Sequence, residues 1–133
     1  SPQSRVTFRF RPPVVALRFA VKRVQVDRAA FSPDRNERVH FALDLDKQLD
    51  PNDRVNQVRT LNLSASIYDL RGRLVRSLYQ GQTRLALAPS DPNLDIWDGR
   101  DNQGRIVPPG IYVIRTVIEP NLSRALRSVV VVR

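Results

Sequence analysis

The fold is decided by the stretch LNLSASIYDLRGRLVRSL, residues 61–78. In its first half every second residue is apolar and the residues between are polar; the apolar set is Leu61, Leu63, Ala65 and Ile67. A period of two predicts a strand with one buried face. Residues 69–72 have the composition of a tight turn, with Gly72 supplying the positive φ that hairpins need. Residues 74–78 are therefore predicted to return as an antiparallel partner.

The same alternation recurs on both sides of this hairpin. Residues 39–45 alternate between apolar and polar, with His40 on the outward face. Near residue 23 the alternation slips by one position, which predicts a bulge or bend at Arg23. Further strands are predicted at residues 15–21, 83–87, 111–118 and 128–133.

No segment repeats its apolar residues with a helical period. Short strands separated by turn residues every 8–12 positions predict an all-β protein, an antiparallel β-sandwich of about seven to nine strands. The residues expected to be mostly buried in it are Trp97, Phe41, Leu43, Leu63, Ile67, Ile111 and Val113.

Composition excludes most kinds of catalytic and metal site. The chain has 133 residues, the size of one domain, with no cysteine and one histidine. It can therefore form no disulfide, thiolate cluster or multi-histidine metal site, and a catalytic triad would depend on His40. No Gly-x-Ser-x-Gly nucleophile elbow is present, and no apolar run approaches the roughly 20 residues of a membrane span. We expect no enzymatic activity, no cofactor and no membrane span.

The chain is strongly basic, with 22 Lys and Arg against 13 Asp and Glu and a net charge of +9. Such a balance raises nucleic acid as a partner. The arginines are spread singly over the sequence, however, and aromatic residues make up 7% of it, so no stacking platform is indicated. A nucleic-acid-binding basic domain is the less favoured alternative, and no specific nucleic acid is expected.

Two groups of carboxylates are candidates for chemistry. Calcium takes six to eight oxygen ligands, and the candidates for it near one sheet end are Asp44, Asp46, Asp50 and Asp53. Their spacing lacks the turn glycine and closing glutamate of an EF-hand, so no metal is assigned. Asp98 and Asp101 could act as a carboxylate pair, but they lie in a turn, where aspartates cap backbone amides.

The first 13 residues form a separate unit in the prediction. Val6, Phe8 and Phe10 alternate with polar residues, so residues 5–11 are predicted to be a strand whose apolar face is buried against protein. Residues 12–13 are both proline, which ends the strand. The sandwich domain is then residues 14–133. Whether the strand completes its own sheet or adds to a neighbour's edge is left open.

Four motifs occur in order along the rest of the chain. They are FSPD at residues 31–34, IYDLRGRLV at 67–75, WDGRDNQG at 97–104 and VPPGIY at 107–112. The set resembles the immunoglobulin-like domain of flagellar hook-capping proteins. It also resembles the related C-terminal domains of exported bacterial proteins, including cargo of the type IX secretion system. The resemblance covers residues 24–133 and implies an immunoglobulin-like sandwich.

Within these motifs each residue has a predicted architectural role. Trp97 is expected in the core between the sheets, and Asp98 and Asp101 are expected to cap backbone amides. The remaining structural residues are the turn and strand-start positions Gly99, Gly104, Gly110 and Tyr112, of which Gly110 is expected to allow close backbone approach. Arg35, Glu37 and Arg38 stand where relatives have a loop rich in glycine and asparagine, so ion binding by that loop is not carried over.

The resemblance implies a non-catalytic structural or interaction module of an exported protein, extracellular or at the cell surface, with the periplasm as the alternative. In one mechanism the domain is an assembly subunit of an extracellular filament or surface structure. There Val6, Phe8 and Phe10 would join neighbouring copies or the parent assembly. In the alternative it is the C-terminal sorting and anchoring domain of a type IX-like secreted protein, and residues 129–133 matter most. The expected partner is protein in both cases.

Overall fold

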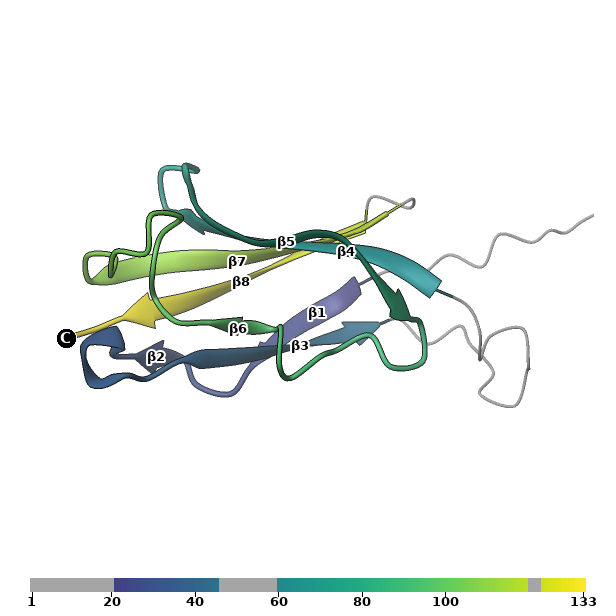
Figure 1. Cartoon of the computed structure of the whole chain (residues 1–133), viewed down its shortest axis with the longest axis horizontal. Coiled ribbons are helices and arrows are strands. Elements are labelled where there is room, and N and C mark those ends of the chain that lie inside the picture. The colour runs from purple at the N-terminus through teal and green to yellow at the C-terminus, as the bar shows by residue number, and fades with distance from the viewer. Residues whose placement is uncertain (1–20, 46–59, 120–122) are drawn as a thin grey trace, which may run out of the picture.

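The computed structural model describes residues 21–45, 60–119 and 123–133, which form a two-sheet β-sandwich (Figure 1). The predicted all-β fold is confirmed. One sheet has the order β1-β3-β6, and the other has the order β2-β8-β7-β4-β5. In Figure 1, β4, β5 and β7 lie in the upper layer and β1, β3 and β6 in the lower one.

The strands of the smaller sheet are β1 (Val21–Val26), β3 (Val39–Leu45) and β6 (Ile96–Trp97). Those of the larger sheet are β2 (Ala30–Phe31), β4 (Thr60–Asp69), β5 (Leu74–Leu85), β7 (Gly110–Glu119) and β8 (Ser123–Val131). A single 3-10 turn, η3 (Pro33–Arg35), is the helical element of the described residues.

Pairing is antiparallel except between β2 and β8, which run parallel. The bulge expected at Arg23 is confirmed, because the register between β1 and β3 shifts between Val21 and Arg23. The hairpin expected at residues 69–72 is also confirmed. Gly72 has φ 80° there and donates its backbone N–H to the Asp69 carbonyl oxygen at 3.0 Å.

The second half of that hairpin is longer than predicted. Separate strands were expected at residues 74–78 and 83–87, but β5 is one strand from Leu74 to Leu85. Its register against β4 shifts three times, and Gly81 adopts a positive φ of 62° within it. The bulges let β5 keep pairing through a polar stretch that interrupts the apolar alternation in the sequence.

Three aromatic rings lie at the centre of the core. Trp97 is completely buried, and its ring meets those of Phe31 and Tyr112 edge-to-face, with centroids 5.5 Å and 5.4 Å away. The burial predicted for this tryptophan is therefore confirmed. It is confirmed as well for Phe41, Leu43, Leu63 and Ile67.

The burial expected for Ile111 and Val113 was wrong. Ile111 is 45% exposed and Val113 is half-buried. The residues of β7 that face the core are Tyr112, Ile114, Thr116 and Ile118. The sequence is apolar on both faces of this strand, so alternation does not decide the phase. Tyr112 decides it, because its ring packs on Trp97 while its hydroxyl donates to the Pro108 carbonyl oxygen at 2.7 Å.

Several predictions fall outside the described residues. They are the N-terminal strand with Val6, Phe8 and Phe10, the boundary between residues 13 and 14, and three of the calcium candidates, Asp46, Asp50 and Asp53. These stay predictions. Among the residues that are described, no helix is long and apolar enough to cross a membrane.

Candidate interaction surfaces

The loop after Trp97 is held together by its own carboxylates. Asp98 accepts the backbone N–H of Arg100 at 3.1 Å, and Asp101 accepts those of Gln103 and Arg105 at 2.9 and 3.0 Å. The Trp97 indole N–H donates to the Arg100 carbonyl oxygen at 3.0 Å. The hydrogen bond from the Arg105 backbone is the largest cause of the lowered pKa of Asp101. Both aspartates therefore act as turn caps.

Glycines allow this loop to approach the rest of the fold. Gly99 has φ 78°, and a Cβ built on it would lie 2.8 Å from Pro33 Cβ and closer still to that ring's Cγ. No side chain fits there, so this glycine joins the loop to η3. Gly104 has φ 81° where the loop turns back. The close approach predicted at Gly110 was wrong, because a Cβ there would meet no atom within 4 Å.

The β4–β5 hairpin uses an aspartate in the same way. Asp69 Oδ1 accepts the backbone N–H groups of Arg71 and Arg73 at 2.9 and 3.0 Å, and its Oδ2 pairs with Arg73 Nε at 3.0 Å. The hydrogen bond from the Arg73 backbone is the largest cause of the lowered pKa of Asp69. These bonds hold the turn in which the exposed Leu70 lies.

A buried ion pair was missed by the sequence analysis. Arg84 on β5 and Asp95 before β6 meet in two hydrogen bonds of 2.7 Å, with side chains 5% and 0% exposed. The Tyr79 hydroxyl also donates to Asp95 at 2.7 Å. Burial, followed by the Asp95 carboxylate, raises the pKa of Tyr79 far above its usual range. Alternation points the other way, because Leu85 and Leu87 are the large apolar residues of this stretch and yet are exposed, while Arg84 and Ala86 take the buried positions.

The other candidate residues lie apart from one another. His40 is exposed, and its Nδ1 lies 3.3 Å from Asp27 Oδ2. Asp44 pairs with Arg23 at 3.0 Å. Within the described ranges, no three acidic or histidine side chains come together in a way that could hold a metal ion.

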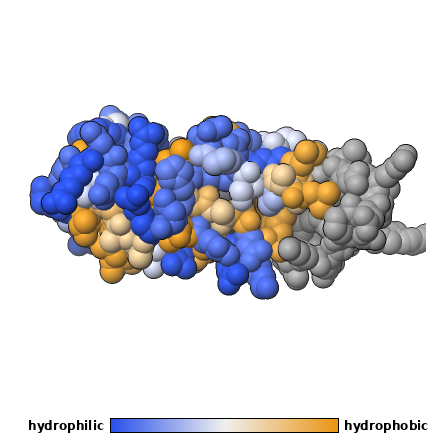
Figure 2. Space-filling view, turned by 90° about the horizontal axis from the view of Figure 1, so that it is seen from below, coloured by the Kyte–Doolittle hydropathy of each residue, from blue (hydrophilic) through white to orange (hydrophobic). Residues whose placement is uncertain are grey.

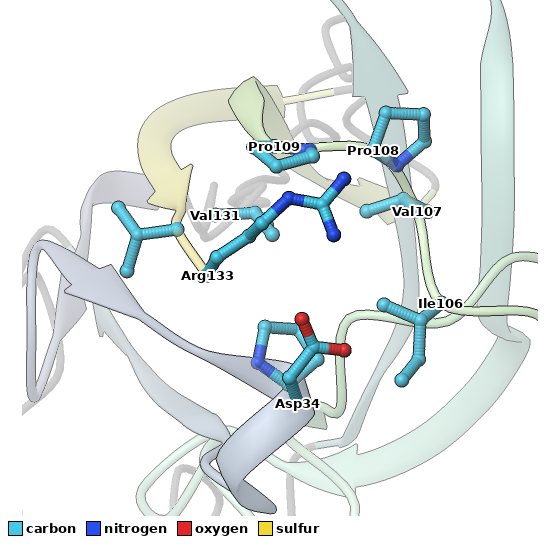
Figure 3. Close-up of a pocket in the computed structure, with 9 residues that line it drawn as sticks. Asp34, Ile106, Val107, Pro108, Pro109, Val131 and Arg133 are labelled. Atoms are coloured by element: carbon cyan, nitrogen blue, oxygen red, sulfur yellow. The ribbon is translucent and has the colours of Figure 1, made fainter.

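A pocket of about 350 Å³ opens where β8 ends. It is lined by η3, by residues 106–109 and by residues 131–133. Figure 3 shows Asp34 and Arg133 directing their charged groups into it from opposite sides, with Pro108, Pro109 and Ile106 around the rim. The strand end that the sequence analysis singled out therefore lies beside a cavity with both charges and apolar walls.

The outer face of the larger sheet carries a second, larger groove of about 510 Å³. Exposed leucines flank it, with Leu70 68% and Leu126 63% accessible, and Arg115 and Arg124 line its other end. Apolar side chains are also exposed elsewhere. Figure 2 shows another face, on which hydrophobic residues are exposed among predominantly hydrophilic ones.

Comparison with known proteins gives a similarity of fold. No protein-family model and no curated protein matches the chain. Among solved structures, 82% of the chain matches 9% of the dimeric latent PorU of Porphyromonas gingivalis, at 20% identity and a TM-score of 0.55. A further match covers 83% of the chain and 11% of PorZ, an essential surface component of the type IX secretion system of that oral bacterium, at 21% identity and a TM-score of 0.48. The chain thus spans about a tenth of either protein, and its sandwich is similar in fold to a domain-sized part of PorU.

Proposed function

We propose that the domain is a non-catalytic module of an exported bacterial surface protein, and that it serves there as a sorting and anchoring domain of the type IX kind. One observation carries the proposal. The motifs that resemble such domains are the same residues that lock one end of the sandwich together. Gly99 packs on Pro33, Trp97 packs between Phe31 and Tyr112, and β8 ends beside them. The similarity in fold to part of PorU supports the β-sandwich on which this assignment depends.

The contacts of the carboxylates support a non-catalytic role. A general acid or base needs an oxygen free to reach a substrate proton. Oδ1 of Asp98 and of Asp101 instead accepts backbone N–H groups of their own loop, and their Oδ2 atoms lie 4.0 Å and 3.6 Å from Arg100 and Arg105; Asp95 is enclosed with Arg84. Asp98 and Asp101, which could be mistaken for a catalytic pair, therefore have a structural role in the loop.

The position of β8 favours a sorting role that depends on folding. This strand pairs with β7 along its whole length. Near its C-terminal end Val129 and Val131 are buried in the core. The residues that follow, Val132 and Arg133, are exposed at the pocket. A receptor could therefore recognise this end of the fold only after the sandwich has formed.

Export of a reporter tests the proposal. The full chain would be fused to the C-terminus of a monomeric reporter carrying an ordinary signal peptide, and expressed in Porphyromonas gingivalis. We expect the reporter at the cell surface in cells with an active type IX system and in the periplasm of cells lacking it, measured by protease accessibility on intact cells.

A matched control replaces the chain by an unrelated β-sandwich of similar size, which should leave the reporter in the periplasm. Periplasmic retention of the test fusion in both strains, with the fusion intact and folded, would contradict the sorting role. Surface delivery that does not depend on the type IX system would contradict it equally.

A further inference from the structure

We infer that the outer face of β4, β7 and β8 is a docking groove for an extended, acidic segment of a partner protein. The inference rests on the proposed interaction role and adds the surface and the chemistry of its partner. It is carried by the arrangement of side chains that the register of these three strands produces.

The groove has an apolar half. Val113 on β7 lies directly between Tyr68 on β4 and Ser128 on β8. Leu126 lies two residues from Ser128 on the same face of β8, and Leu70 lies at the tip of the β4–β5 hairpin. Both leucines line the groove and are mostly exposed. Large accessible leucines around a half-buried valine leave apolar surface without cover, which in soluble proteins marks an interaction site.

The other half of the groove is cationic. Arg115 lies opposite Leu126 and Arg124 lies opposite Val117, so both arginines face the same side as Val113. On β4 the facing residues are Ser64 and Ser66. The hollow itself lies beside them, between Tyr68 on β4 and the two arginines.

These two arginines carry charge without a carboxylate partner among the described residues. Neither takes part in any ion pair there. Arg115 instead lies over the Tyr68 ring, 5.9 Å from its centroid, and donates to the tyrosine hydroxyl at 3.4 Å. Asp69 also lines the groove, but it is bound by Arg73. Glu119 shares this face. It lies four residues along β7 from Arg115, about 13 Å at the rise of a strand, and diagonally across from Arg124, which pairs with Val117, but it forms no ion pair with either arginine.

The positive charge of Arg115 and Arg124 determines which kind of segment can bind in the groove. In a symmetric pair each copy would present the same patch, so a second copy would bring like-charged arginines together. The chain's own residues 1–20 contain four arginines and no Asp or Glu, so they match the cationic half no better. A partner segment with carboxylates complements it. Since side chains two residues apart on a strand are about 7 Å apart, one apolar residue over Val113 would place a carboxylate two positions on at Arg115.

Peptide binding by the whole purified chain tests this. The probe is a fluorescent decapeptide, Gly-Ser-Thr-Ile-Thr-Glu-Thr-Glu-Gly-Ser, and its control has glutamine at both glutamate positions. We expect the acidic peptide to bind about tenfold more tightly than the glutamine peptide, as for charge-assisted hydrogen bonds, with the difference shrinking as salt rises. Backbone amide NMR shifts should map to β7 and β8 around residues 113–117 and 124–126.

Arg124→Glu should weaken binding of the acidic peptide about tenfold. Arg127→Glu is the matched control, because it makes the same charge change on the same strand at an exposed residue of the opposite phase; it should have little effect. Both variants must unfold at the temperature of the unaltered protein. Equal loss in both variants would show a general charge effect and overturn the proposal, as would amide shifts on another surface.

The remaining occupants give distinct results. Concentration-dependent self-association that Leu126→Ser abolishes would assign the groove to a second copy. Movement of the Val113 and Leu126 resonances in a Phe8→Ser, Phe10→Ser variant would assign it to the chain's own N-terminal segment. Either result overturns the acidic partner. Binding of the peptide together with failed reporter export would leave the groove standing and remove only the sorting role.

Discussion

The two faces of β7 are similar in composition and opposite in surroundings. The inward face carries Tyr112, Ile114, Thr116 and Ile118, all buried. The outward face carries Ile111, Val113, Arg115 and Val117, which are exposed or half-buried. Both are mainly apolar, yet the second sheet covers one of them and nothing in the described residues covers the other. The difference teaches that apolar alternation alone does not identify the core face, and that an apolar outward face is a candidate for partner contact.

The largest effect is expected from the centre of the covered face. Trp97→Ala removes the ring that packs against Phe31 and Tyr112, and should lower the free energy of unfolding by about 3–5 kcal/mol. Urea unfolding followed by circular dichroism measures this. A loss below about 1 kcal/mol would mean that the sheets do not depend on the aromatic cluster for their packing.

Breaking the buried ion pair of Arg84 and Asp95 should lower the free energy of unfolding by nearly as much. Asp95→Ala leaves the Arg84 guanidinium buried without its partner, and should cost about 3–5 kcal/mol of unfolding free energy. The control is the double variant Arg84→Met, Asp95→Leu, which removes both charges and should lose clearly less. Equal losses in the two variants would show that the hydrogen bonds, and not the uncompensated charge, dominate this site.

The two turns capped by Asp69 and Asp101 should make the free energy of unfolding depend on pH in the acid range. The pKa values of Asp69 and Asp101 are lowered in the folded chain, first of all by backbone hydrogen bonds from Arg73 and Arg105. A lowered folded pKa means that the stabilisation is complete above the ordinary aspartate value of about 3.9 and is lost as pH falls through the folded value. Unfolding midpoints between pH 5 and pH 2 should therefore fall less steeply for Asp69→Asn than for the unaltered chain. An unchanged slope would contradict the role of Asp69.

The smallest effect on stability is expected on the uncovered face. Ile111→Ser and Leu126→Ser change side chains that are 45% and 63% exposed, so each should alter unfolding free energy by no more than about 0.5 kcal/mol. Ile114→Ser, on the covered face of the same strand as Ile111, is the matched comparison and should be strongly destabilising. A large loss from Leu126→Ser would show that this face is covered in the folded chain.

The local structure of the chain could be predicted from its sequence. Strict alternation at residues 61–67 and 39–45 set which side chains face inward, because every second side chain of a strand points the same way. Turn chemistry located the Asp69–Gly72 hairpin and the capping roles of Asp98 and Asp101, since those bonds join residues within four positions of one another. The bulge at Arg23 was visible as a slip in the same alternation.

Other features were decided only when distant segments met. The phase of β7 depends on Tyr112 packing against Trp97, and the length of β5 depends on bulges that keep it paired with β4. The cage around Asp95 joins residues from position 79 to position 95, and the parallel pairing of β2 with β8 joins residues about a hundred positions apart. The outer groove likewise exists because β4, β7 and β8 are neighbours in one sheet. Local propensity carries no information about such contacts, because their free energy comes from surfaces that the chain brings together only on folding.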